Sequence, residues 1–428
     1  MSHVTEARPS SFRWFICILL FLATTINYID RQILSLLKPI LDHELHWTNE
    51  QFGYVNSAFQ GAYAIGLLMF GWFVDRKGEK IGYTVSIIWW SVGAAAHALV
   101  YTVSGFIMAR VVLGLGEGGN FPSAVKGVAH WFPKRERALA TSLFNAGTNV
   151  GAIIAPAVVP WAAYKWGWHG TFVAAAVVGM LWLVLWIPFY SAPEKSKHVN
   201  AAELDHITSD REVESTKKIG WLEILRYRQA WSFVVGKFLT DPVWWFFLIW
   251  LPDFFKKTRG LDIKTSWVHL VTIYSIVTVL SIFGGWVTGY LTKSGWSVTR
   301  ARKTGMFIFA LCVLPILAVA KVGDWWAVML IGLAGAAHQA WSANLYTTVS
   351  DMFPKRAVAS LVGIGGMAGS AGGIMFPIYS GKLLDQFEKA NNAAGGYAIL
   401  FSICAFAYLV AFALHHILAP KFEQVKID

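Results

Sequence analysis

Charge and cysteine are both scarce in this sequence of 428 residues. Charged residues make up only 14% of it and hydrophobic residues 56%, and the mean hydropathy is +0.49. A soluble protein of this length needs far more charge to cover its surface, so the composition excludes a soluble protein. The sequence has fewer acidic residues than basic ones, 25 against 36. The basic excess gathers in loops between apolar runs, so it does not indicate nucleic-acid binding.

The chain has only three cysteines, Cys17, Cys312 and Cys404, each inside an apolar run and without paired spacing. This pattern predicts neither a disulfide framework nor a metal site. The sequence also has no nucleophile–base pair, and its glycine-rich GLGEGGNFP lies within an apolar run, where it is a poor phosphate cradle. We therefore expect no enzyme activity, no metal and no cofactor.

Apolar runs of roughly 20 residues, the length a helix needs to cross a bilayer, recur from end to end. Helices satisfy their own backbone in lipid, so the sequence predicts an all-α membrane protein. Twelve spans are expected, six on each side of a polar segment at 191–229. They cover residues 14–37, 52–74, 81–101, 106–128, 138–162, 171–190, 231–255, 267–291, 304–322, 325–349, 357–384 and 397–418.

An internal repeat relates the two sets of six spans. FPKR at 132–135 recurs at 353–356, an offset of 353 − 132 = 221, and the same offset maps Gly151 onto Gly372 and Pro156 onto Pro377. The domains expected are therefore an N-terminal bundle (1–190), a cytoplasmic central loop (191–229) and a C-terminal bundle (230–428). Two pseudo-symmetric bundles indicate a carrier that opens a cleft near the bilayer midplane to each side in turn. We expect it to act as a monomer.

Lysine and arginine place both termini on the cytoplasmic side, because the loops on that side hold most of the basic residues. The central loop adds Arg211, Lys217 and Lys218, among others. An exception follows the seventh span, where a basic group lies in a loop predicted to be outside. This group is Lys256, Lys257, Arg259 and Lys264.

Four charges inside the predicted spans are the first functional candidates. Asp30 and Arg31 adjoin in the first span, and Arg110 and Glu117 lie seven residues apart on one face of the fourth, about 10 Å along the helix. A charge within the bilayer is costly unless it is paired or faces water. In the predicted scheme, Arg110 neutralises Asp30 or Glu117 once that acid has lost its proton, while Arg31 binds a substrate carboxylate.

Two other interpretations of these charges stay open. The four residues would also form a purely structural ion-pair network, although such a network is expensive in lipid. Arg31 alone would also be explained by snorkelling of its guanidinium to the outer interface.

Further substrate-binding candidates lie in the second, fifth and seventh spans. Tyr63 would hydrogen-bond a hydroxyl or carboxylate, or else belong to the core. Thr148 would line the cleft or bond a neighbouring helix. Lys237 and Asp241, four residues apart in GKFLTDPVWW, are close enough to pair beside a bend at Pro242. Snorkelling of Lys237 is the alternative to substrate binding.

The tenth span, AGAAHQAWSANLY, carries polar and aromatic side chains that would form a face for a polyol. His338 is the repeat mate of Glu117, since 338 − 117 is again 221. The alternative is that His338 is a core residue whose hydrogen bonds are made within the protein. The accompanying candidates are Gln339, Trp341 and Asn344.

The loop after the second span resembles a signature of the major facilitator superfamily. GWFVDRKGEK has Gly71, Asp75, Arg76, Gly78 and Lys80 in place, with Asp75 and Arg76 expected to bridge helix ends as a gating loop. NYIDR, ARVVLGLGEGGNFP, HWFPKRERA and FNAGTNVGAIIAP resemble the superfamily's anion:cation symporter branch. RYRQAWSFVVGKFLTDPVWWFFLIWLP and AHQAWSANL look most like its hexuronate transporters. The resemblance covers nearly the whole chain.

This resemblance implies proton-driven import of glucuronate or galacturonate across a bacterial inner membrane. Arg31 would bind the substrate carboxylate, helped by Tyr63, while Asp30 and Glu117 would take up protons with Arg110 as their partner. Where related sugar-acid carriers have a glutamine, this chain has Thr148. The main alternative is a symporter for another organic anion, such as an aldonate, aldarate or aromatic acid. A binding-only receptor would have no need of Asp30 and Glu117.

Overall fold

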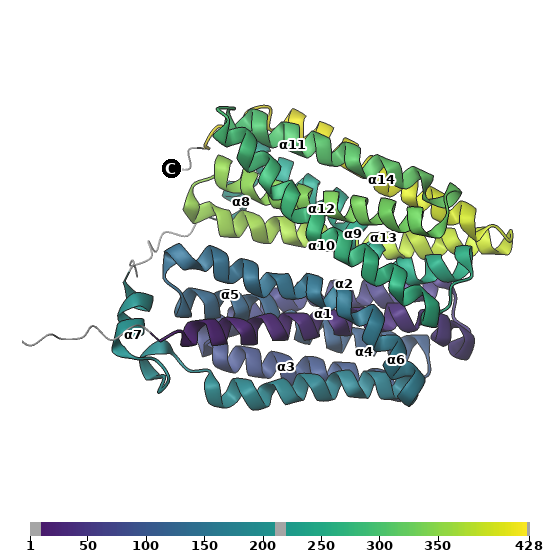
Figure 1. Cartoon of the computed structure of the whole chain (residues 1–428), viewed down its shortest axis with the longest axis horizontal. Coiled ribbons are helices and arrows are strands. Elements are labelled where there is room, and N and C mark those ends of the chain that lie inside the picture. Colours follow the sequence, from purple (N-terminus) through teal and green to yellow (C-terminus); the bar gives the residue numbers. More distant parts are fainter. Residues whose placement is uncertain (1–9, 210–219, 426–428) are drawn as a thin grey trace, which may run out of the picture. The chain divides into compact units, whose positions relative to one another are not determined.

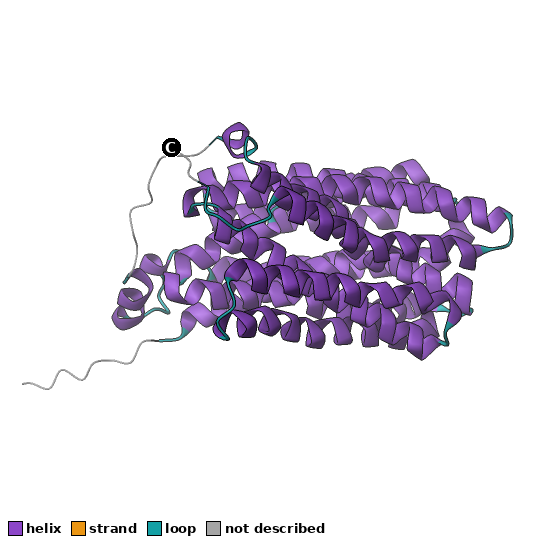
Figure 2. Cartoon of the chain, turned by 90° about the horizontal axis from the view of Figure 1, so that it is seen from above, coloured by secondary structure: helices purple, strands orange, loops and turns teal. Residues whose placement is uncertain are grey.

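The computed structural model describes residues 10–209 and 220–425, which form helices and no β-strand (Figures 1 and 2). This confirms the predicted all-α class. Arg211, Lys217 and Lys218 of the predicted central loop lie outside the described residues. The α-helices are α1 (Phe12–Leu45), α2 (Asn49–Lys77), α3 (Glu79–Ala96), α4 (Val103–Glu117), α5 (Asn120–Trp131), α6 (Lys134–Phe189), α7 (Ala201–Thr208), α8 (Trp221–Ile224), α9 (Arg228–Arg259), α10 (Ile263–Lys293), α11 (Val298–Val313), α12 (Asp324–Met352), α13 (Lys355–Lys389) and α14 (Ala393–Leu418).

The helices follow the predicted spans, with several local differences. The predicted fourth span is two helices, α4 and α5, separated at Gly118–Gly119. The fifth and sixth spans are joined in α6, which is interrupted at Gly167, where φ is 68° and glycine is favoured. The ninth span ends as a 3-10 helix, Leu314–Lys321, with a proline in its first turn. Seven helical segments of the described residues are by themselves long and apolar enough to cross a membrane.

The chain divides into two compact units. Unit 1 consists of residues 1–34 and 61–215, and unit 2 of residues 35–60 and 216–428. The end of α1 and the start of α2, residues 35–60, group with the second half of the chain.

The internal repeat recurs as local structure in both units. Each FPKR motif starts a long helix, α6 or α13, with its proline as an extended N-cap (φ −61°, ψ 153° and φ −64°, ψ 149°). Each repeat-related glycine also meets the backbone of a neighbouring helix. A Cβ on Gly151 would lie 2.6 Å from the Thr25 carbonyl oxygen of α1, and one on Gly372 would lie 2.5 Å from the Phe238 carbonyl oxygen of α9. The offset read from the sequence thus corresponds to a repeated helix–helix contact.

The part of the central loop before residue 210 is attached to unit 1 through α7. The buried Glu203 carboxylate accepts hydrogen bonds from the backbone N–H groups of Phe12 and Arg13 (3.2 and 3.1 Å), and from the Arg13 guanidinium (3.0 Å). It thus satisfies amide groups that the first turn of α1 leaves unpaired, at the positive end of the helix dipole.

A second acid, Glu79, organises the start of α3, ahead of the predicted third span. Its carboxylate is hydrogen-bonded to His130 of α5 (2.6 Å) and to the hydroxyl of Tyr190 (2.8 Å). Burial raises the pKa of this carboxyl, but the bonds from His130, the backbone and Tyr190 outweigh burial and bring the pKa to about 2. The ionised Glu79 carboxylate therefore links α3 to α5 and to the end of α6 through hydrogen bonds.

Candidate functional site

The central feature of unit 1 is a buried ion pair between α1 and α4. Arg31 Nε donates to Glu117 Oε2 at 2.6 Å, and the two residues are only 7% and 0% exposed. The predicted scheme gave Arg110 either Asp30 or Glu117 as its partner and left Arg31 for the substrate, whereas the structure pairs Arg31 with Glu117. Seven residues along one helix separate Arg110 from Glu117 by about 10 Å, whereas Arg31 approaches Glu117 from the neighbouring helix.

Two tyrosine rings enclose the Arg31 guanidinium. Its Cζ lies 4.3 Å from the ring centre of Tyr63 on α2 and 4.8 Å from that of Tyr28 on α1. Both distances are within the range of cation–π attraction, which strengthens when water is excluded. Tyr63 was predicted from sequence and Tyr28 was not, although its place three residues before Arg31 on the same helix face was a usable signal.

Asp30 and Arg110 are buried close to this pair. Arg110 Nη2 donates to the Arg31 carbonyl oxygen at 3.4 Å, and Asp30 interacts electrostatically with both Glu117 and Arg110. Among the described residues, neither carboxylate oxygen of Asp30 has a hydrogen-bond partner. Unit 1 therefore gathers two acids and two arginines in one interior region.

Thr148 lies on α6 beside a close contact with α1. A Cβ on Gly147 would lie 2.6 Å from the Phe21 carbonyl oxygen, and the Gly151 contact with Thr25 follows one turn later. Thr148 is thus nearly buried where two backbones touch, and any ligand contact it makes would be through its small hydroxyl.

In unit 2, Lys237 and Asp241 pair within α9. Lys237 Nζ lies 2.6 Å from Asp241 Oδ2, and also 4.6 Å from the ring centre of Tyr346 on α12. Lys237 is buried rather than extended towards an interface, so the structure contradicts the snorkelling alternative for this residue. Pro242 follows the pair inside the helix, where it removes one backbone hydrogen bond.

The tenth-span candidates on α12 face mainly the interior of unit 2. His338 Nδ1 is hydrogen-bonded to the Tyr408 hydroxyl at 2.6 Å, and its ring stacks on Trp244 with 5.6 Å between centres. Trp341 is fully buried, and the Asn344 amide donates to the Ala340 carbonyl at 2.8 Å. Gln339 is the half-exposed member of the group. In this conformation His338 has the arrangement of a satisfied core histidine.

Sequence reasoning missed a second buried charge cluster, around Lys38 in unit 2. Lys38 Nζ contacts Asp42 Oδ2 (2.6 Å), Asn49 Oδ1 (2.9 Å) and Asp253 Oδ1 of α9 (2.9 Å). Lys257, four residues after Asp253, bonds the same Asn49 oxygen at 2.9 Å. The spacings of four residues between Lys38 and Asp42 and between Asp253 and Lys257 were the available signal. This cluster joins the end of α1 and the start of α2 to α9.

Comparison with known protein families identifies the family of this chain. The family model described as "Major Facilitator Superfamily" matches residues 20–377, which is most of the chain. The chain belongs to the Major Facilitator Superfamily. It is therefore a membrane transporter and not an enzyme, as the sequence predicted.

Relatives within the superfamily carry names of sugar-acid transporters. The chain is 30% identical over 420 residues to a hexuronate transporter of Escherichia coli (strain K12), covering 96% of this chain and 94% of the relative. It is also 30% identical over 444 residues to a probable galactarate/D-glucarate transporter of Bacillus subtilis (strain 168), covering 99% and 97%. A solved bacterial homolog of the human lysosomal transporter Spinster, inward-facing and occupied, matches with a TM-score of 0.77. At 16% identity, covering 96% and 97% of the two chains, it shows the fold alone.

The superfamily loop between α2 and α3 makes a contact on the surface of unit 1. Asp75 Oδ1 lies 3.2 Å from Lys126 Nζ of α5, and the same ammonium donates to the Val74 carbonyl at the end of α2 (2.9 Å). Arg76 lies over the Trp72 ring, 4.1 Å from its centre. Asp75 is exposed and Lys126 is partly exposed, so the ion pair between them is weak.

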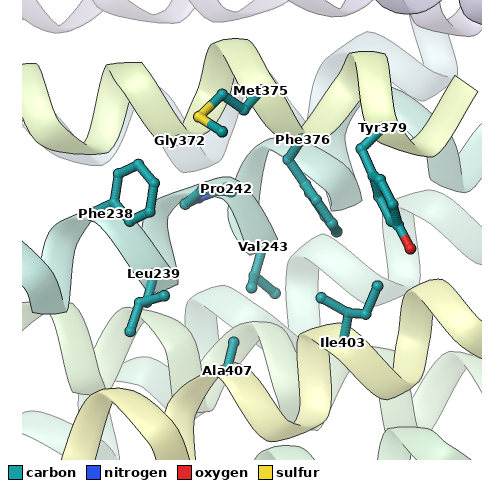
Figure 3. A pocket seen from close by; sticks show the side chains of 10 residues that line it. All are labelled: Phe238, Leu239, Pro242, Val243, Gly372, Met375, Phe376, Tyr379, Ile403 and Ala407. Carbon is teal, nitrogen blue, oxygen red and sulfur yellow. The ribbon is translucent and has the colours of Figure 1, made fainter. Parts of the chain in front are cut away.

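An apolar cavity of about 310 Å³ lies in unit 2 between α9, α13 and α14 (Figure 3). Phe238 and Pro242 line it from α9, Met375 and Tyr379 from α13, and Ile403 from α14. The Tyr379 hydroxyl is the one side-chain oxygen among the residues drawn in Figure 3. Such a lining does not suit a polyhydroxylated anion, so this cavity is not our candidate substrate site.

Proposed function

We propose that this protein is a proton-coupled symporter that imports a hexuronate, glucuronate or galacturonate, by alternating access. It would act as a monomer in a bacterial inner membrane, with both termini in the cytoplasm. The observation that carries the proposal is the Arg31–Glu117 pair at 2.6 Å in the interior of unit 1. Charges are retained at such positions in membrane proteins mainly for function.

Competition for Arg31 would link the proton to the anion. While Glu117 is ionised, it occupies Arg31 Nε. Protonation of Glu117 removes its negative charge, which leaves the guanidinium as an unbalanced cation in a low-dielectric region. A substrate carboxylate then restores the balance by a forked bond, with Tyr63 contacting the same guanidinium. Anion and proton therefore bind together, and Arg31 returns to Glu117 when both have left.

Asp30 and Arg110 would form the second half of the coupling group. A buried carboxylate without hydrogen bonds is costly when charged, so Asp30 is suited to gain and lose a proton as its distance from Arg110 changes. The hydroxyl groups of the sugar acid would bond to Thr148, Lys237, His338, Gln339, Trp341 and Asn344. Those that are buried in this conformation would require a side-chain rearrangement. Asp75 and Arg76 would open and close with the transport cycle.

The relatives support a sugar acid as the substrate class. The named substrates of the two relatives compared above are a hexuronate and the aldarates galactarate and glucarate, at the same 30% identity. The second candidate function is therefore symport of another organic anion, an aldarate first, with aldonates and aromatic acids as further options.

Transport by purified protein in liposomes tests the proposal. Labelled galacturonate should exchange across the membrane, and unlabelled glucuronate should compete with it. If neither hexuronate competes while an aldarate, aldonate or aromatic acid does, the substrate assignment is wrong and the second candidate replaces it. Glu117→Gln should keep exchange but lose accumulation driven by a proton gradient.

A further inference from the structure

Three basic side chains line a polar hollow at the start of α11. The hollow has a volume of about 530 Å³, and its charged lining residues are Arg300, Lys303 and Lys421 together with a single acid, Glu423. Positive groups therefore outnumber negative ones in the lining, which gives the hollow a positive potential. All of the lining residues belong to unit 2, so the hollow is complete within one unit.

Lys303 is the buried cation of this hollow. The residue is only 9% exposed, and its ammonium donates to two neutral acceptors, Nδ1 of His416 at 3.0 Å and the carbonyl oxygen of Pro420 at 2.7 Å. Among the residues that the structure describes, no carboxylate forms an ion pair with this ammonium. A buried charge is costly without a counter-charge, and an ammonium has three protons to donate. Lys303 can therefore offer one more hydrogen bond and its full charge to an anion.

The other two cations of the hollow are held by contacts within the protein. The Phe422 N–H donates to Thr299 Oγ1 at 3.1 Å, which attaches the segment after α14 to α11 and places the adjacent Lys421 beside the hollow. Arg300 lies against the Trp296 ring, with 4.3 Å between its Cζ and the ring centre. This distance is within the range of cation–π attraction. The positive groups thus converge on one place in the folded chain.

The helix face that starts in the hollow continues as exposed apolar surface. Arg300 and Thr304 line the hollow, and three apolar side chains follow them at helical spacing on the same side of α11. These are Phe307, Ile308 and Leu311, which are 43%, 41% and 41% exposed. Exposed apolar surface of this kind in a membrane transporter marks contact with lipid. A positive group with an apolar strip running from it matches a molecule with an anionic head and hydrocarbon tails.

We propose that this hollow binds the phosphate group of an anionic phospholipid, whose acyl chains lie along Phe307, Ile308 and Leu311. Basic pockets at the ends of membrane-spanning helices suit such head groups. The planar guanidinium of Arg300 can fork onto two phosphate oxygens, and Lys303 adds a point charge. A free phosphate compound would leave the apolar strip unused, and a zwitterionic lipid would bring its own ammonium group close to three cations.

Native mass spectrometry of the purified full-length protein tests this site. The probes are phosphatidylglycerol, which is anionic, phosphatidylethanolamine with the same acyl chains, which is zwitterionic, and glycerol 3-phosphate, which has no acyl chains. The wild type should bind phosphatidylglycerol more tightly than phosphatidylethanolamine, and an equal concentration of glycerol 3-phosphate should not displace it. Arg300→Gln/Lys421→Gln removes two exposed charges of the hollow, so its Kd for phosphatidylglycerol should rise by about tenfold or more.

Lys256→Gln/Lys321→Gln is the matched control. It removes two exposed lysines of the same unit, at the end of α9 and at the end of the 3-10 helix that follows α11. The length of α10 or α11 separates these positions from the hollow, and salt screens exposed charges beyond about 10 Å. The Kd of this variant for phosphatidylglycerol should therefore stay within about twofold of the wild-type value.

Lys303→Gln should weaken phosphatidylglycerol binding as well, and if this variant is not monodisperse the exposed pair decides alone. An unchanged Kd in folded Arg300→Gln/Lys421→Gln, or an equal loss in the control variant, overturns the site. Equal wild-type binding of the two lipids also overturns it, because the three cations would then have no effect on the choice of head group. Displacement of phosphatidylglycerol by glycerol 3-phosphate would identify a site for free phosphate compounds and would overturn the lipid as its occupant.

Discussion

Replacement of Arg31 by lysine separates the charge of this residue from its shape. The guanidinium reaches Glu117 through Nε at 2.6 Å and lies between the rings of Tyr28 and Tyr63. An ammonium keeps the positive charge but offers a single point of attachment, so it cannot grip a carboxylate with two parallel bonds. Arg31→Lys should therefore fold, and it should bind substrate weakly.

The expected loss follows from the contacts of the side chain. One charge-assisted hydrogen bond is worth about 1.5–3 kcal/mol, and each 1.4 kcal/mol changes a dissociation constant about tenfold. Losing one of the two bonds to a substrate carboxylate should thus raise the Kd by about 10- to 150-fold. Calorimetric titration of detergent-purified protein with galacturonate measures this value directly.

Arg76→Lys is the matched control for this experiment. It makes the same chemical change at an exposed position in the last turn of α2, where the guanidinium lies on the Trp72 ring. Its Kd for galacturonate should stay within about twofold of the wild-type value, because an exposed cation–π contact is worth only about 0.5–1 kcal/mol and is remote from Arg31. A wild-type Kd in Arg31→Lys would refute the assignment of Arg31 as the carboxylate-binding residue.

Three further predictions concern stability, measured by thermal unfolding in detergent. The folded pKa of Glu79 is about 2 and its ordinary value is 4.5, so the ionised carboxylate contributes fully to stability above pH 4.5 and the contribution is lost as the pH falls towards 2. Glu79→Gln should therefore be less stable than the wild type at pH 6, and its stability should decline less between pH 5 and 3. Lys38→Met should lower the free energy of unfolding by about 3–5 kcal/mol, because it leaves the buried Asp253 carboxylate poorly compensated. Adding Asp253→Asn should restore part of this stability, and equal stability of the single and double variants would contradict the prediction. Gly93→Ala should destabilise by about 1–3 kcal/mol, since its Cβ would lie 2.7 Å from the Leu113 backbone, whereas Gly71→Ala, with nothing within 4 Å, should not.

The helical architecture was predictable because lipid leaves the backbone few choices. Apolar length alone located the spans, and the FPKR repeat located equivalent helix starts, which the extended Pro133 and Pro354 caps confirm. The points at which helices are interrupted were harder to predict. The interruption between α4 and α5 at Gly118–Gly119 lies inside an apolar run that reads as one span. Glycine there was visible in the sequence, but a helix break and close helix packing give the same signal.

The charged residues of the site were predictable, but their partners were not. Spacing on one helix gives the face and depth of Arg110 and Glu117, and no information on which side chain of another helix reaches them. The structure pairs Glu117 with Arg31, which sequence had reserved for the substrate. Lys38 was passed over because it stands at a span end, where a lysine usually meets water. Its burial depends on Asp253, 215 residues away.

Uptake of labelled galacturonate into liposomes under an imposed pH gradient tests the coupling of proton and anion most directly. An acidic outside solution should drive accumulation by wild-type protein above the external concentration. Glu117→Gln should exchange galacturonate across the same membrane without accumulating it. Accumulation that does not depend on the gradient, or full accumulation by Glu117→Gln, would contradict a mechanism in which the Glu117 carboxylate and the substrate carboxylate compete for Arg31.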